Sequence, residues 1–375
     1  MRAIVIAWTF PLAAFGAQAQ APQPPAVAAH AFHVSDLTSG QVLAQHKAGE
    51  RVEPASLTKL MTAYLVFAAM RDGRLAPTQQ VQVSAHARQA PGSRTFLEEG
   101  SSVSVETLLL GMVVQSGNDA CIALAEVLAG SEALFAEQMN REAARLGMHD
   151  TRFANATGLP HAQHYSTARD LALLAAALIR DFPQEYARYY TMREFRHNDI
   201  TQMNRNRLLW LDPSVDGVKT GFTEAAGYCL IASSERGGRR LLTVLLGADS
   251  DAARARESQK LLNWGYLFFD GVRLYEPGQA VKAIYVWKGA DEAVRAGFER
   301  GLVVTVPKGE AKLLAAELLT HPPVLAPVAK GDKVGVLRVA LDGRPLGEYP
   351  VVALESVPQA GILGRAWDTL RLWLK

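Results

Sequence analysis

Strand-forming segments lie on both sides of a long helical stretch, and this order constrains the fold more than any other feature of the sequence. Residues 31–36 and 40–44 are predicted as two short strands joined by a turn, and residues 54–180 are predominantly helical. More strands follow between residues 215 and 246, where Gly237-Gly238 marks a hairpin. We therefore expect an α+β domain in which the two ends share one sheet.

A second module follows the last predicted helix, which covers residues 252–269. Beyond Pro277-Gly278 the sequence contains short segments that are typical of β-strands, with a turn at Asp342-Gly343. The predicted strands are residues 281–287, 302–306, 334–339 and 347–353. They indicate a small all-β sandwich, and no cluster of residues in it suggests chemistry.

The N-terminus has the composition of a secretory signal peptide. Arg2 precedes an apolar run over residues 3–15, and Ala17-Gln18-Ala19 supplies the small residues of a cleavage site. A membrane-spanning anchor is the alternative, but the apolar run is too short to cross a bilayer. We therefore expect the mature protein to be exported.

The C-terminus, residues 360–375, has the period of an amphipathic helix. Its apolar stripe is made by Leu363, Trp367, Leu370 and Leu374. Tryptophans with basic neighbours favour a helix that lies on a membrane surface, while a helix docked on the sandwich is the alternative. We expect the tail to bind the cytoplasmic-membrane surface.

The chain therefore divides into successive segments. Residues 1–19 are the signal peptide, and residues 20–28 are a Pro-rich spacer that we expect to be disordered. Residues 29–276 form the first domain, residues 277–357 the β-sandwich, and residues 358–375 the amphipathic helix. A chain of 375 residues is long enough for two domains.

Composition excludes several classes of function. The formal net charge is +2 and no basic run is dense, so we expect no nucleic-acid partner. The two cysteines, Cys121 and Cys229, either form one disulfide or remain two buried thiols. There is neither a Cys/His cluster at zinc spacing nor an acidic calcium loop, so we expect no metal and no other cofactor.

Ser56 and Lys59 are the first candidates for catalysis. Residues three apart on a helix share a face, so a helix that starts near Pro54 places Ser56 one turn from Lys59. A serine hydroxyl needs a base within hydrogen-bond reach to become a nucleophile. Lys59 can be that base because burial in an apolar helix, and a second cation at Lys219, both lower the pKa of a lysine.

Two further motifs supply partners for this pair. In Ser116-Gly117-Asn118, Ser116 can relay a proton to a leaving amine, and Asn118 can orient either the substrate backbone or Lys59. In Lys219-Thr220-Gly221, the first two residues can hold a substrate carboxylate, and Gly221 lets a ligand approach the strand closely. Backbone N–H groups, that of Ser56 among them, can form an oxyanion hole.

Each motif alone has an ordinary structural explanation: a capping serine, a turn, or a solvated lysine on a strand. Together, and in this order, they resemble the motifs of penicillin-binding proteins and class A β-lactamases. Nearly the whole chain resembles a low-molecular-mass penicillin-binding protein, a serine-type D-alanyl-D-alanine carboxypeptidase (peptidase family S11) of the Gram-negative envelope. The other segments that carry the likeness are residues 155–160, 164–171, 204–206, 216–221 and 224–228.

The resemblance implies a β-lactamase/transpeptidase-like catalytic domain, a β-sandwich stalk and a membrane helix at the periplasmic face of the inner membrane. It implies an enzyme of cell-wall remodelling and cell-shape control that removes the terminal D-alanine from peptidoglycan pentapeptides. The reaction would pass through an acyl-enzyme on Ser56, and β-lactams would inactivate the same serine.

The resemblance also implies residue roles. Lys59 would be the proton acceptor, Ser116 the second catalytic serine and Lys219 the substrate-carboxylate contact. Arg254, and secondarily Arg205, match positions that help to order the carboxylate site.

Phe222 departs from the pattern, because family members often have histidine after Lys-Thr-Gly. This change bears on rate or substrate preference and leaves the three motifs intact. Three alternatives remain: a D,D-endopeptidase with the same site, a class A β-lactamase, and a non-catalytic wall- or membrane-binding protein. The β-lactamase is disfavoured because no Glu-x-x-Leu-Asn occurs between Ser116 and Lys219.

Overall fold

A computed structural model describes residues 22–320, 323–361 and 368. The first domain is built on a five-stranded antiparallel sheet with the strand order β2-β1-β9-β8-β7. The strands are β1 (Ala31–Asp36), β2 (Gln41–His46), β7 (Val215–Thr223), β8 (Gly227–Arg236) and β9 (Arg239–Ala248). N- and C-terminal strands thus share one sheet, and the predicted α+β class is confirmed.

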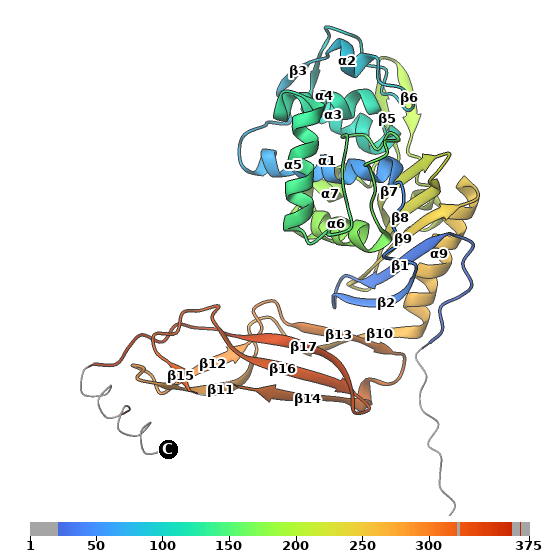
Figure 1. Ribbon diagram of the computed structural model, residues 1–375. Helices are drawn as coiled ribbons and strands as arrows, with labels where there is room; N and C mark the ends of the chain where they lie inside the picture. Colours follow the sequence, from blue (N-terminus) through green and yellow to red (C-terminus); the bar gives the residue numbers. More distant parts are fainter. Residues whose placement is uncertain (1–21, 321–322, 362–367, 369–375) are drawn as a thin grey trace, which may run out of the picture.

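Helices cover both faces of this sheet (Figure 1). One face carries the insert, with α1 (Lys59–Arg71), α3 (Val105–Leu110), α4 (Asn118–Ala129), α5 (Glu132–Arg145), α6 (Ala168–Asp181) and α7 (Pro183–Tyr189). The other face is covered by α9 (Asp251–Phe268), which packs Leu261 and Trp264 against Phe32 and Val34 of β1. α1 contacts α4, α5 and α6, and this central position explains why it is apolar on nearly all sides.

Shorter elements surround the helices. They are η1 (Ala55–Thr58), β3 (Gln80–Gln82), α2 (Ala85–Arg88), β4 (Ser102–Ser104), η2 (Gly111–Gln115), β5 (Glu194–His197), β6 (Ile200–Met203) and α8 (Leu208–Leu211). Ser104 accepts a hydrogen bond from the Thr107 N–H, which confirms its predicted role as the cap of α3. The β5–β6 hairpin was not predicted from the sequence.

The second module is a β-sandwich with its own core, centred on buried residues such as Val294, Val304, Val339 and Val351. A six-stranded sheet has the order β14-β16-β17-β12-β11-β15, and β10 pairs with β13. The strands are β10 (Phe269–Tyr275), β11 (Ala280–Trp287), β12 (Ala293–Gly297), β13 (Leu302–Pro307), β14 (Leu314–Leu319), β15 (Val324–Leu325), β16 (Lys333–Leu341) and β17 (Arg344–Ala353), with the turn η3 (Ala311–Leu313).

The boundary between the two domains was expected at residue 277, but this position lies inside the second module. Since β10 pairs with β13, the sandwich starts at Phe269, directly after the last residue of α9. No loop separates the helix from the strand, and the Asp270-Gly271 pair, which resembles a turn signal in the sequence, lies inside β10.

One threonine joins the two modules. The Thr305 hydroxyl, on β13, donates to the buried Asp36 carboxylate over 2.7 Å and lies 2.7 Å from the Ser39 hydroxyl. The Gln41 side chain donates to the Thr305 carbonyl over 3.0 Å and accepts from its N–H. Arg239 also binds Asp36, over 2.6 Å. These contacts connect β13 to the β1–β2 hairpin of the first domain (Figure 1).

The spacer differs from expectation. Its described part, residues 22–28, runs along α9: the Trp264 indole donates to the Gln23 carbonyl, and Lys260 to the Ala26 carbonyl, each over 2.9 Å. The prediction of disorder is wrong for these residues because α9 offers them hydrogen-bond donors.

The two cysteines are buried free thiols, so the disulfide is excluded. The signal peptide and most of the amphipathic tail (residues 362–367 and 369–375) lie outside the described residues and stay predictions. Among the described residues, no helix is both long and apolar enough to cross a membrane.

Candidate active site

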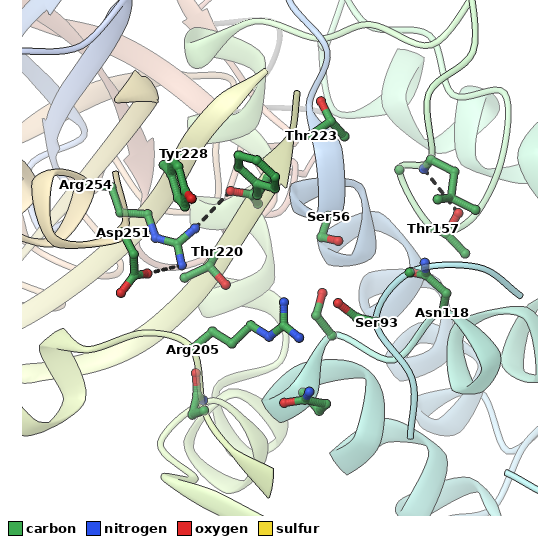
Figure 2. Close-up of a pocket in the computed structure, with 18 of the residues that line it drawn as sticks. Ser56, Ser93, Asn118, Thr157, Arg205, Thr220, Thr223, Tyr228, Asp251 and Arg254 are labelled. Atoms are coloured by element: carbon green, nitrogen blue, oxygen red, sulfur yellow. Dashed lines mark hydrogen bonds and ion pairs between the residues drawn. The ribbon is translucent and has the colours of Figure 1, made fainter. Parts of the chain in front are cut away.

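A cavity of about 810 Å³ opens between the edge strand β7 and the helical insert. Ser56, Ser116, Asn118, Thr220 and Arg254 are among the residues that line it. In Figure 2, Ser56 lies near the centre, with Asn118 and Thr157 on one side and Arg254, Asp251 and Tyr228 on the other. The three motifs, far apart in the sequence, thus meet at one cavity.

Ser56 lies in the η1 turn, and Lys59 is the first residue of α1. The Lys59 amine is buried behind the serine and donates to the Ser56 hydroxyl over 3.0 Å. Its other acceptors are the Asn118 side-chain oxygen at 2.7 Å and the Thr157 carbonyl at 2.6 Å. All three donors of an ammonium group are therefore used, and one of them points at the serine.

Burial lowers the pKa of Lys59 to about 8, and the positive charge of Arg205 acts in the same direction. A base with a pKa near the working pH can both take and return a proton. Arg205 is thus a cation that acts on Lys59 beside Lys219, the cation that sequence reasoning named, and the charges of the two lysines repel each other. The charge of Lys59 in turn adds to burial in holding the pKa of Lys219 well below its ordinary value.

Ser116 and Lys219 form a second pair. Ser116 lies between η2 and α4 with a left-handed backbone (φ 67°), and Lys219 donates to its hydroxyl over 2.9 Å. The Lys219 amine also donates to the Thr220 carbonyl over 3.1 Å. Lys219 is almost fully buried, so it reaches the cavity through Ser116.

Asn118 orients Lys59. Its side-chain oxygen accepts from Lys59, and its amide nitrogen donates to the Pro91 carbonyl over 2.6 Å. The next residue, Asp119, accepts from the N–H groups of Thr95 and Leu97 and so holds the loop that borders the cavity. Sequence reasoning missed Asp119, whose position directly after Asn118 was the available signal.

The far side of the cavity is formed by β7 and α9. Arg254 donates to the Gly221 carbonyl over 3.0 Å and forms an ion pair with Asp251. The ring of Phe222 is half exposed and contacts Tyr228 with centroids 4.5 Å apart. Arg254 and Arg205 both line the cavity, where their charges favour an anionic group.

The segment around Thr157 is another part that sequence reasoning did not assign to the site. Gly158 has a φ of +85°, and a Cβ there would lie 1.8 Å from the Ala55 carbonyl oxygen. Only glycine permits this contact with the turn that carries Ser56. Across the described residues, no three or more His, Cys, Asp and Glu side chains are grouped to hold a metal ion.

Known proteins share this architecture. Residues 18–250 match the family model described as D-alanyl-D-alanine carboxypeptidase (Peptidase_S11). The chain belongs to this family. Residues 269–359 match the C-terminal domain of penicillin-binding protein 5, which agrees with the start of the sandwich at β10.

Individual members of the D-alanyl-D-alanine carboxypeptidase family cover almost the whole chain. D-alanyl-D-alanine carboxypeptidase DacC of Escherichia coli is 44% identical over 95% of this chain and 90% of its own length. DacA of Escherichia coli is 39% identical over 94% of this chain and 89% of its own length. The crystal structure of penicillin-binding protein 5 from Haemophilus influenzae, 36% identical, matches with a TM-score of 0.84 over 90% of this chain and all of that chain.

Proposed function

We propose that this enzyme hydrolyses the bond before the C-terminal D-alanine of peptidoglycan pentapeptides through an acyl-enzyme on Ser56. The observation that carries the proposal is the buried Lys59 amine, 3.0 Å from the Ser56 hydroxyl and with a pKa lowered to about 8. Lys59 takes the hydroxyl proton while the Ser56 oxygen attacks the carbonyl carbon of the scissile bond.

Ser116 and Lys219 complete the first step. The leaving D-alanine amine needs a proton, and the Ser116 hydroxyl, bonded to Lys219, is placed to deliver it. The D-alanine carboxylate is recognised by Thr220 of β7 and Arg254 of α9, which line the cavity. Water then attacks the ester on Ser56, and the same groups return the protons.

β-Lactams acylate Ser56 in the same way. This part of the proposal is supported by the similarity to penicillin-binding protein D2 of Listeria monocytogenes, solved in an ampicillin-bound form, with 32% identity and a TM-score of 0.59 over 64% of this chain. Ser56 lines the cavity described above, with the Lys59 amine 3.0 Å from its hydroxyl.

Labelled penicillin and a D-alanine-release assay test the proposal. Ser56→Ala is expected to abolish both the covalent adduct and D-alanine release, because among the described residues Ser56 supplies the hydroxyl that accepts from the Lys59 amine. Ser93→Ala is the matched control: Ser93 lines the same cavity, and loss of its hydroxyl is expected to leave the adduct. An adduct that persists in Ser56→Ala would overturn the assignment. Cleavage of a cross-linked dimer in preference to the pentapeptide would identify an endopeptidase instead.

For localisation, we propose that the enzyme is exported and binds the periplasmic face of the inner membrane through residues 358–375. The support is the signal-peptide pattern and the amphipathic stripe of the sequence. A chain that ends at Pro358 is expected to leave the membrane fraction while it retains penicillin binding. Continued sedimentation with membranes would contradict the proposal.

A further inference from the structure

The Thr157 carbonyl, which accepts from Lys59, belongs to a segment that buried groups hold from several sides. The Ala156 carbonyl accepts from the Thr62 hydroxyl over 2.8 Å, and the Ala156 N–H donates to Glu132 over 3.0 Å. The Asn155 side-chain oxygen accepts from the N–H groups that follow it, including that of Gly158 at 2.8 Å. The position of the Thr157 carbonyl, and so of its contact with Lys59, is therefore controlled by side chains outside the three motifs.

His164 connects this segment to the nucleophile motif. Its Nδ1 accepts from the Ala154 N–H over 3.2 Å, which leaves the ring hydrogen on Nε2, and Nε2 donates to the Thr58 hydroxyl over 2.8 Å. The imidazole is 3% exposed and packs edge-on against Phe153. Both ring nitrogens are thus hydrogen-bonded, Nδ1 to the Ala154 backbone and Nε2 to the Thr58 side chain.

Thr58 lies between the nucleophile and the base. Its hydroxyl would be only 2.9 Å from a Cβ at Gly158, so the Thr58 side chain touches the backbone that presents the Thr157 carbonyl. A displacement at Thr58 or Ala154 therefore reaches the carbonyl through direct contacts. None of the three sequence motifs contains His164.

The imidazole is neutral when the enzyme works. Burial, followed by the charges of His161 and Lys59, lowers the pKa of His164 to about 4. Other charged groups also act on Lys59: Arg205 lowers its pKa, and Glu132 and Asp119 raise it. The buried Cys121 thiol raises it too, and the charges of Lys59 and Lys219 repel each other.

We propose that His164 is a positioning residue that holds the Thr157 carbonyl against the Lys59 amine and so keeps that amine aimed at Ser56. This inference rests on the proposed function, in which Lys59 is the base. The Thr157 carbonyl stabilises the protonated Lys59 amine more than the neutral amine, because a charged N–H donor makes the stronger hydrogen bond. Loss of the contact therefore disfavours the charged form and lowers the pKa of Lys59.

The test compares two variants of the full chain, His164→Leu and His164→Gln. The measurement is the second-order rate constant for acylation by a labelled penicillin as a function of pH. Leucine removes both hydrogen bonds, so we expect the plateau rate to fall about tenfold and the acid limb of the profile to move about one pH unit lower. Glutamine keeps one donor and one acceptor, so we expect it to retain both the plateau and the limb.

Thr58→Val gives a second route if His164→Leu does not fold. This nearly isosteric change removes the hydroxyl that His164 binds and is expected to move the acid limb in the same direction. His149→Gln, a change at an exposed histidine, is the matched control and should leave the profile unaltered.

Two outcomes would overturn the inference. One is equal loss of rate in His164→Leu and His164→Gln, which would indicate that hydrogen bonding by residue 164 is not what matters. The other is a lower plateau with an unmoved acid limb in both His164→Leu and Thr58→Val, as a purely structural role would give. Failure of the proposed function is distinguishable, because the unaltered enzyme would then form no adduct at all.

Discussion

Acidification from pH 8 to pH 6 is the perturbation that most directly tests Lys59 as the base. With its pKa lowered to about 8 by burial, Lys59 is neutral in about half of the molecules at pH 8 and in about one in a hundred at pH 6. Only the neutral amine can accept the Ser56 proton. Acylation should therefore slow about 50-fold over this interval.

The assay is the rate of covalent labelling at penicillin concentrations far below saturation, so that the profile reports groups of the free enzyme. Burial and the charge of Lys59 hold the pKa of Lys219 well below its ordinary value, so the two lysines repel each other and their titrations are linked. Lys59→Arg is the matched variant, because a guanidinium stays protonated at every pH used. It should lose at least about a hundredfold in rate and show no acid limb near pH 8.

A rate that stays flat between pH 6 and pH 8 would refute the reasoning, since a buried lysine with a lowered pKa must lose its neutral form over that range. A rate that rises on acidification would mean that a protonated group, rather than a free base, limits acylation. A limb near pH 8 that persisted in Lys59→Arg would assign the titration to another residue.

Two further predictions concern stability. Gly158→Ala should destabilise the fold by more than about 2 kcal/mol in urea unfolding, because its Cβ would meet the Ala55 carbonyl at 1.8 Å; unchanged stability would show that the η1 turn can move. Burial lowers the pKa of both His33 and His164 from 6.5 to about 4. Both histidines are therefore neutral in the folded and unfolded chain above pH 6.5, and protonation of each should lower the free energy of unfolding by about 3 kcal/mol as the pH falls towards 4. Thermal unfolding at pH 7 and pH 4.5 measures the loss, and equal melting temperatures would contradict it.

Local sequence patterns were sufficient to predict most strands and helices of the first domain. Gly237-Gly238 does connect β8 to β9, and the helical stretch does separate strands of one sheet. These features depend on residues close together in the sequence, such as a glycine pair with positive φ in a hairpin turn. The β5–β6 hairpin was missed although Asn198-Asp199, both with positive φ, forms its two-residue turn, because strands of four residues carry a weak periodic signal. The start of the sandwich at Phe269 was missed because the strand follows the helix directly.

For the site, the motif residues were predicted and their partners were not. Ser56, Lys59, Ser116 and Lys219 form the two hydrogen-bonded pairs that the chemistry required. A backbone carbonyl such as that of Thr157 has no sequence signature, because every residue has one. A buried histidine such as His164 is equally hard to assign, since its role depends on which backbone groups pack around it.

The sequence by itself determined the chemical groups of this protein: a serine and a lysine one turn apart, a second serine, and a lysine on a strand edge. Those identities favour acyl transfer, in which a hydroxyl nucleophile is activated by an amine base. Only the tertiary structure decided how the groups are tuned. Burial lowers the pKa of Lys59, the charge of Arg205 lowers it further, and the Thr157 carbonyl orients the amine. The physical reason is that burial, charge and carbonyl direction depend on segments about a hundred residues apart in the sequence, which only folding brings within hydrogen-bond distance.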